Sequence, residues 1–395
     1  VTAGDRARLT IKVTNQGKAP YHRLYGISRS DNEQFDNHEF LFGRIEPGES
    51  KEWTVTMPIA DDTLSQSVSM SVDFQSSGAR PPKALRFPVH VASLDAPQFG
   101  LVYRIDDSKT GNGDGLIQLQ EDVELVLTAQ NHGRGDGKAL IATLRAAPDA
   151  PKRRLFIRRG RIKSDPISVG DTKEFRFKFR IKGNQSTEIP LRVGVGDPKI
   201  GSFSIRRLTL RPVGPMKRLS SQDLTLRPAA GASIQLYAQP NKDASIVAWV
   251  PGVTVGRPGI MGWYRISLDD GTYGWADSGS LSRVDRSSST TSARRGQIPA
   301  PIRFKIENEQ SLRTTKNSAV RITGQISSDG PLKDLRVYVN NRKTYFRSAS
   351  QSDSLSRLDF TVTTPLKEGL NRIDFVARSE HNPGQRHTIV IEREK

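Results

Sequence analysis

Cysteine is absent from all 395 residues of the chain. Its absence excludes a disulfide framework, a zinc–cysteine site and a cysteine nucleophile. Cysteine-free chains are also typical of bacterial exported proteins, whose thiols would be oxidised outside the cytoplasm. We therefore expect an exported protein, in the bacterial periplasm or at the cell surface.

Long hydrophobic runs are also missing. A membrane-spanning helix needs about 20 consecutive apolar residues, and no stretch approaches this length, so no transmembrane segment is expected. The apolar content of 35% fits several small domains with much surface and little core. The chain begins at Val1, with no charged-then-apolar leader, and runs directly into a strand pattern. We expect it to be a fragment of a longer chain.

Acidic residues are outnumbered by basic ones, 42 to 60, and the net charge of the chain is +18. Such a surface attracts anionic partners, although charge also serves solubility. Phe156 is the only aromatic residue in the densest basic cluster, so no nucleic-acid partner is expected. The favoured interpretation of this basic cluster is that it lies on strand edges and blocks aggregation through its charge. The alternative is that it binds an anionic envelope polymer or a lipid surface. The cluster comprises Lys152, Arg153, Arg154, Arg158, Arg159, Arg161 and Lys163.

Catalytic motifs are lacking as well. The six histidines are scattered without metal-ligand spacing, and neither a Gly-x-Ser-x-Gly elbow nor a phosphate-binding glycine loop occurs. The prediction is that this chain has no catalytic site and is not itself an enzyme. Spacing does not reveal a site assembled from distant residues, so that alternative stays open.

Short alternating runs, bounded by Gly, Pro, Asn and Asp, dominate what is present. They predict an all-β protein of tandem immunoglobulin-like β-sandwiches with one small barrel. An internal repeat supports two related sandwiches: Asn15 and Gly17 close one strand pattern as Asn131 and Gly133 close another. The predicted units are sandwiches at 1–96, 97–214 and 299–395, a small barrel at 219–284, and a flexible Ser-rich linker at 285–298.

The sharpest motif is an acidic, glycine-rich loop early in the second sandwich. Asn112, Asp114, Gly115 and Glu121 reproduce the third, fifth, sixth and twelfth positions of a calcium loop. Calcium requires six to eight oxygen ligands, a glycine at the tight bend and a closing carboxylate. The motif predicts a calcium site.

The first ligand position of this loop falls on Thr110 rather than on an aspartate. Asp106 or Asp107 would then reach in from the preceding strand, and we take Asp107 as the candidate ligand. The alternative is an ordinary glycine turn with Glu121 exposed beside it.

Three of the four tryptophans lie within residues 219–284. The stretches Gly-Trp-Tyr-Arg-Ile at 262–266 and Asp-Gly-Thr-Tyr-Gly-Trp at 270–275 make this unit resemble bacterial SH3-like domains. The resemblance implies a module that binds cell-wall peptide or protein. Trp263 and Trp275 are expected in the core, whereas the predicted ligand groove comprises Tyr237, Trp249 and Tyr273.

Taken in order, the units resemble the tail of large carboxy-terminal-processing (tail-specific) serine peptidases of myxobacterial type. The stretches that carry the resemblance are residues 42–49, 112–115, 273–275, 339–343 and 365–373.

The resemblance implies that a serine–lysine catalytic core and a peptide-binding PDZ domain precede this region in the same polypeptide. No catalytic residue can be transferred to this chain. The implied function is non-catalytic binding and positioning, with protein or peptide substrate, or cell-wall polymer, as partner. The alternative is a stand-alone structural or adhesive surface protein of bacteria.

Overall fold

A computed structural model describes residues 1–152, 154–183, 187–214, 220–229, 233–284, 292–349, 356–380 and 382–394. These residues form strands β1 to β30, and their only helices are two short 3-10 turns. The predicted all-β class is thereby confirmed. Within the same residues no helix is long and apolar enough to cross a membrane.

The first domain is a sandwich of a two-stranded and a four-stranded sheet. Along its first strand more buried side chains alternate with exposed ones, as a half-buried sheet requires. The smaller sheet pairs β1 (Arg6–Thr14) with β4 (Ser50–Pro58), and the larger runs β3 (Glu39–Ile45), β2 (Tyr21–Ser30), β5 (Gln66–Gly78), β6 (Leu85–Val91).

The second domain is a sandwich of two four-stranded sheets. Phe175, Phe177 and Phe179 alternate with Lys and Arg along one strand and are buried between the sheets. One sheet runs β10 (Leu155–Arg159), β12 (Thr172–Ile181), β8 (Asp122–Asn131), β7 (Phe99–Asp106). The other runs β11 (Arg161–Ser164), β9 (Leu140–Ala146), β13 (Ile189–Asp197), β14 (Ser202–Leu210).

Most of the basic cluster lies on β10 and β11, which are both edge strands. Arg158 forms an ion pair with Asp122 at 3.0 Å and lies over the ring of Phe156. Arg153 falls outside the described residues. Charged side chains at these two edges disfavour pairing with a strand of another molecule.

The internal repeat recurs as one hydrogen-bond pattern around a buried asparagine. In the first domain the Asn15 Nδ2 group donates to the carbonyls of Ala19 and Ile45, and its Oδ1 accepts from the Gly17 N–H. Its backbone pairs with Gly48 and Glu49.

The second domain repeats each of these bonds. The Asn131 Nδ2 group donates to Gly135 and Ile167, its Oδ1 accepts from Gly133, and its backbone pairs with Gly170 and Asp171. In both domains a single asparagine, through its side chain and its backbone, therefore ties the Asn-x-Gly turn to the later Gly-acid turn.

We expect Asn131→Ala to lower the free energy of unfolding by about 1–3 kcal/mol, because the substitution removes the side-chain hydrogen bonds to Gly133, Gly135 and Ile167 and leaves the Ile167 carbonyl with the Gly137 N–H alone. Gln130→Ala is the matched control, since it removes one exposed hydrogen bond, to Gly170, from the adjacent residue. Urea unfolding of both variants measures the difference. Equal costs would show that Asn131 does not hold the two turns together.

The third unit contains one sheet of eight strands. Trp275 is fully buried in it, as expected for a core residue, whereas Trp263 is only partly buried. The strand order is β21 (Leu281–Arg283), β15 (Leu224–Pro228), β18 (Thr254–Pro258), β19 (Trp263–Ser267), β20 (Tyr273–Asp277), β16 (Ile234–Tyr237), β17 (Ile246–Val250), β22 (Arg294–Arg295).

Strand β22 lies inside the range predicted as a flexible linker. Arg294 pairs with Trp249 and Arg295 with Ala248, and the Gly296 N–H donates to Val247. This part of the range is ordered because the outer edge of β17 offers backbone groups that it can pair with. Residues 285–291 of the predicted linker fall outside the described residues.

The fourth domain is a sandwich of a three-stranded and a five-stranded sheet with its own hydrophobic core. One sheet runs β23 (Arg303–Ile306), β25 (Ala319–Ser327), β28 (Arg357–Pro365). The other runs β24 (Thr314–Thr315), β30 (Gln385–Arg393), β29 (Gly369–Ser379), β26 (Leu332–Val339), β27 (Arg342–Ser348).

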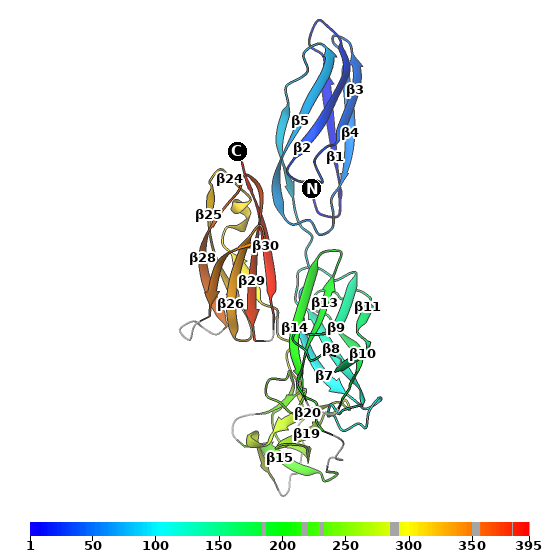
Figure 1. Cartoon of the computed structure of the whole chain (residues 1–395), viewed down its shortest axis with the longest axis vertical. Helices are drawn as coiled ribbons and strands as arrows, with labels where there is room; N and C mark the ends of the chain where they lie inside the picture. Colours follow the sequence, from blue (N-terminus) through cyan, green and yellow to red (C-terminus); the bar gives the residue numbers. More distant parts are fainter. Residues whose placement is uncertain are drawn as a thin grey trace.

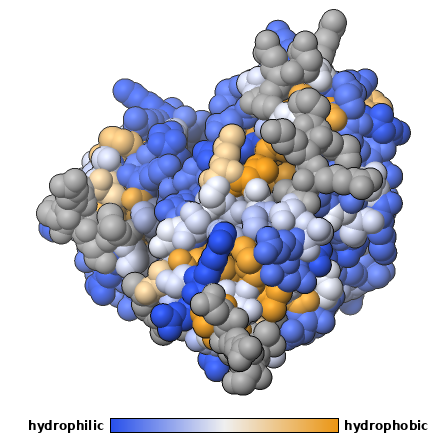
Figure 2. All heavy atoms as spheres, turned by 90° about the horizontal axis from the view of Figure 1, so that it is seen from below, coloured by the Kyte–Doolittle hydropathy of each residue, from blue (hydrophilic) through white to orange (hydrophobic). Residues whose placement is uncertain are grey.

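The chain descends through the first three units and then folds back, so that the fourth domain lies beside the first two (Figure 1). The Glu392 carboxylate of β30 accepts a hydrogen bond from the Ser69 N–H of β5, at 2.9 and 3.0 Å to its two oxygens. The second domain and the third unit share one continuous hydrophobic core. Seen from the end that carries the third unit, apolar side chains form patches within a largely hydrophilic surface (Figure 2).

Candidate functional site

The calcium-type loop connects β7 to β8 and is organised around a buried carboxylate. Asp107 is fully buried, and both of its carboxylate oxygens lie 3.1 Å from the Gly115 N–H. Asp114 is also buried, where it accepts from Leu116 N–H at 2.8 Å and Gln118 Nε2 at 2.6 Å. The loop thus brings two of the four predicted ligands into its interior.

The other two predicted ligands join the same network. The Asn112 side chain donates to Asp114 at 2.9 Å, and its backbone N–H donates to Glu121 Oε1 at 2.7 Å. Gly111 lies so close to Glu121 that a side chain there would collide with the carboxylate. Asp107, Asn112, Asp114 and Glu121 are therefore neighbours in space, as the sequence predicts.

The carboxylates of the loop repel one another. Burial raises the pKa of Asp107, and the negative charge of Asp114 raises it further against the hydrogen bond from Gly115. Burial also raises the pKa of Glu121, and the charges of Asp107 and Asp114 add to the effect. The ionised loop is thus short of positive charge.

Two buried oxygen atoms of the loop, Glu121 Oε2 and Thr110 Oγ1, have no hydrogen-bond partner among the described residues. Together with the carboxylate and amide oxygens they form the hard donor set that calcium prefers. Within the described part of the chain, no group of three or more His, Asp or Glu side chains is placed so that it could hold a metal ion. The donor chemistry fits the preference of calcium for hard oxygen ligands.

Tyr273, which the sequence assigned to a ligand groove, lies elsewhere. It is 8% exposed, and its hydroxyl donates to the Ile105 carbonyl at 2.9 Å and lies 3.2 Å from the Asp107 carboxylate. Gly115 packs against the edge of its ring. This corrects the groove assignment: Tyr273 joins the third unit to the acidic loop, because that loop covers its face of β20.

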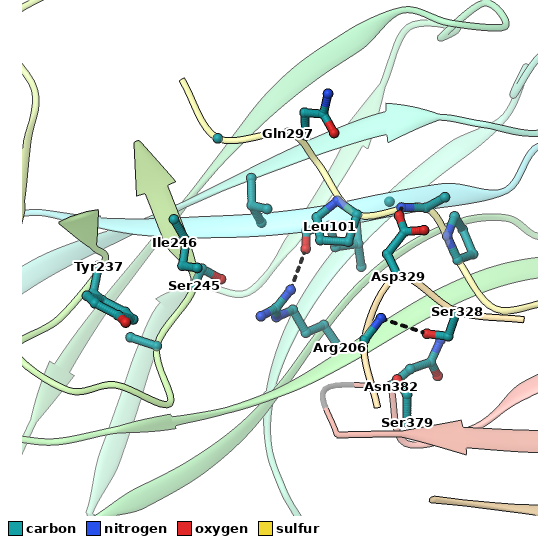
Figure 3. Close-up of a pocket in the computed structure, with 18 of the residues that line it drawn as sticks. Leu101, Arg206, Tyr237, Ser245, Ile246, Gln297, Ser328, Asp329, Ser379 and Asn382 are labelled. Atoms are coloured by element: carbon teal, nitrogen blue, oxygen red, sulfur yellow. Dashed lines mark hydrogen bonds between the residues drawn. The ribbon is translucent and has the colours of Figure 1, made fainter. Parts of the chain in front are cut away.

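The other two groove candidates, Tyr237 and Trp249, line a cavity of about 860 Å³. The second domain contributes β7 and β14 to its wall, the third unit contributes β16, β17 and β22, and the fourth domain contributes loops around Asp329 and Asn382 (Figure 3). Its volume lies within the range of small-molecule and peptide sites. A cavity bounded by three units could not be inferred from any one of them.

Aromatic rings form one side of this cavity. Tyr237 is half-buried, packs edge-to-face on Trp263 with ring centroids 5.6 Å apart, and donates from its hydroxyl to Gln235. Burial raises its pKa above the ordinary value of a tyrosine. Trp249 is also half-buried and pairs across the ladder with Arg294.

Arg206 of β14 lies in the cavity wall and was not identified from the sequence. It is 8% exposed, and its Nη1 donates to the Leu101 carbonyl at 2.8 Å (Figure 3). The sequence did hold a signal, because alternation along β14 places Arg206 on the same face as the buried Leu208 and Leu210.

Comparisons with known proteins leave the family of this chain open. No protein-family model matches it, and no curated protein sequence matches it. Among solved structures, the crystal structure of red sea bream transglutaminase is similar over 54% of this chain and 30% of that chain, with 10% sequence identity and a TM-score of 0.21.

Proposed function

We propose that this chain is a non-catalytic binding and positioning region of an exported tail-specific serine protease, and that it engages protein substrate or cell-envelope polymer. The observation that carries the proposal is the cavity where the second domain, the third unit and the fourth domain meet. Its aromatic wall, Tyr237 and Trp249, offers flat apolar surface with a polar tip, as recognition surfaces commonly do. The link to a protease comes from the sequence resemblance.

Positioning is the second half of the proposal. The shared core of the second domain and third unit, together with the contact between Glu392 and Ser69, opposes free rotation of the domains. A bound chain would then have a defined distance and direction from a catalytic core in the same polypeptide.

We propose further that calcium binds the loop of Asp107, Asn112, Asp114 and Glu121. Because the Tyr273 hydroxyl contacts the Asp107 carboxylate, a cation there would stabilise the docking of the third unit as well as the loop. Through that docking it would also support the cavity.

A structural or adhesive surface protein is the competing function. It predicts that binding follows the +18 charge of the chain rather than the cavity. Salt separates the two, because screening weakens charge-driven association more than binding to a buried aromatic surface.

The cavity proposal predicts that the double variant Tyr237→Ala, Trp249→Ala loses about tenfold or more in affinity for peptidoglycan fragments or casein peptides, since two anchoring rings disappear. Tyr264→Ala is the control, because this tyrosine of β19 lies outside the cavity wall. Retention on immobilised ligand is measured at low and moderate salt. Equal retention of all three proteins, or loss of all binding at moderate salt, would favour the adhesive alternative.

A further inference from the structure

The most unusual group in the cavity wall is the guanidinium of Arg206. Arginine is rarely buried without a carboxylate partner, because transfer of its charge out of water is costly. Arg206 is 8% exposed and forms no ion pair among the described residues. Its Nε is buried without a hydrogen-bond partner, and Nη1 reaches only the neutral carbonyl of Leu101.

The fold offers a reason for Arg206 to face the cavity. Strands β7 and β14 are the edge strands of the two sheets of the second domain, and they lie on the same side of the sandwich. Ser204 and Arg206 of β14 reach across to the backbone of β7, at Phe99 and Leu101. This seam forms one wall of the cavity, so the remaining donors of the guanidinium lie beside its interior.

Two of the other charged residues of the wall form ion pairs: Lys242 pairs with Asp277 at 2.7 Å, and Arg295 pairs with Asp270. Arg294, which is exposed, also lines the cavity. The carboxylate of Asp329 accepts a hydrogen bond from the Ala300 N–H. Among the described residues, Arg206 is therefore the deeply buried positive charge of the wall that lacks an anion.

We propose that the cavity binds a ligand with one carboxylate and an apolar or aromatic body, and that Arg206 receives the carboxylate. The planar fork of a guanidinium matches a carboxylate in two parallel hydrogen bonds. A single arginine balances one negative charge, whereas phosphate groups are commonly held by arginine clusters or helix N-termini. Tyr237 and Trp249 contact the body of the ligand. The inference rests on the proposed function only in taking the cavity as a binding site.

The test compares matched ligands by isothermal titration calorimetry on the full chain. 3-Phenylpropionate is paired with its neutral amide, and the dipeptide acid N-acetyl-Leu-Phe with its C-terminal amide. Each acid is expected to bind about tenfold to a hundredfold more tightly than its amide, the usual gain from a charged hydrogen bond. If the dipeptide acid binds more tightly than 3-phenylpropionate, the natural ligand carries its carboxylate at the end of a peptide chain. If 3-phenylpropionate binds more tightly than the dipeptide acid, the natural ligand is a small organic acid.

Arg206→Met should bind acid and amide equally, and Arg206→Lys should keep only part of the preference because it keeps the charge without the fork. Arg207→Met is the matched control, since the neighbouring side chain pairs with Asp149 away from the cavity. Arg206→Met should also melt no lower than the wild type, because it removes an uncompensated buried charge. A purely structural role for Arg206 predicts a lower melting temperature and an unchanged acid preference.

The outcomes separate this inference from the proposed function. Equal binding of acid and amide to the wild type, or tighter binding of phenyl phosphate than of 3-phenylpropionate, would overturn the carboxylate assignment and leave the cavity a binding site. Failure of every ligand to bind, together with unchanged peptidoglycan and casein retention in the Tyr237 and Trp249 double variant, would overturn the binding site itself.

Discussion

Gly115→Ala is expected to destabilise the protein by roughly 2–5 kcal/mol, more than Gly113→Ala two residues earlier. Both glycines have positive φ, +86° and +75°, so alanine carries a backbone strain of about 1–2 kcal/mol at either position. At Gly113 a Cβ meets only the Ser108 Cα, at 4.0 Å, whereas at Gly115 it collides with the Tyr273 ring. Overpacking of this kind adds about 1–3 kcal/mol.

Urea unfolding in the presence of a chelator measures both variants without calcium. Combining Gly115→Ala with Tyr273→Ala should recover part of the loss, because the two residues are in contact and their effects do not add. Equal costs at Gly113 and Gly115 would mean that Tyr273 does not pack against the loop in solution.

The second large effect on stability is expected at Asp106 and Asp107, two adjacent aspartates whose pKa values are shifted in opposite directions. Asp107 has a raised pKa, so its ionisation opposes folding, and Asp107→Asn should stabilise the calcium-free protein at neutral pH. Asp106 is the matched control. Burial favours its neutral form, but hydrogen bonds from Ser108, Arg176 and Arg104 outweigh burial and hold its pKa well below its usual range. Asp106→Asn should therefore destabilise the protein at neutral pH.

The pH dependence follows from the direction of each shift. A raised pKa in the folded state, as at Asp107 and Glu121, means that the contribution of these two groups to the stability of the calcium-free protein is largest in acid and falls as the pH rises. The lowered pKa of Asp106 has the opposite sign, so the deficit of Asp106→Asn should shrink as the pH falls.

Calcium should reverse the loss of stability that Asp107 causes as the pH rises, because calcium binds the ionised loop. At a free concentration one hundred times its Kd it would stabilise the wild type by about 2.7 kcal/mol. Asp107→Asn should lose most of this gain. Melting curves with calcium and with chelator, recorded from acid to neutral pH, measure these effects. Identical wild-type curves in the two conditions, with no heat of calcium binding, would rule out the site.

The sequence predicts a structural feature best where that feature depends on residues close together in the chain. Alternation along strands such as β12 follows from the two-residue period of an extended chain, and it indicated the all-β class. The repeat of Asn15 and Asn131 was visible because turn chemistry demands particular residues at particular spacings. The same holds for the acidic loop, whose four predicted ligands are neighbours in the structure.

The exposure of a side chain and the identity of its partners were harder to predict, because both depend on domains that are distant in the sequence. Tyr273 and Trp249 look alike as aromatic residues of short strands, yet the acidic loop buries Tyr273 while Trp249 lines the cavity. Arg294 and Arg295 appeared to belong to a linker, since a two-residue strand has no periodicity and the edge of β17 decides their pairing.

By itself, then, the sequence determined the class of fold, the repeated turns and the oxygen-rich loop, because each depends on interactions within or between neighbouring strands. The tertiary structure alone decided which aromatic rings stay accessible, that Arg206 has no anionic partner in the part of the chain that the structure describes, and that a cavity exists where three units meet. These features depend on how separate surfaces exclude water from one another, and residue spacing along a single chain does not encode that directly.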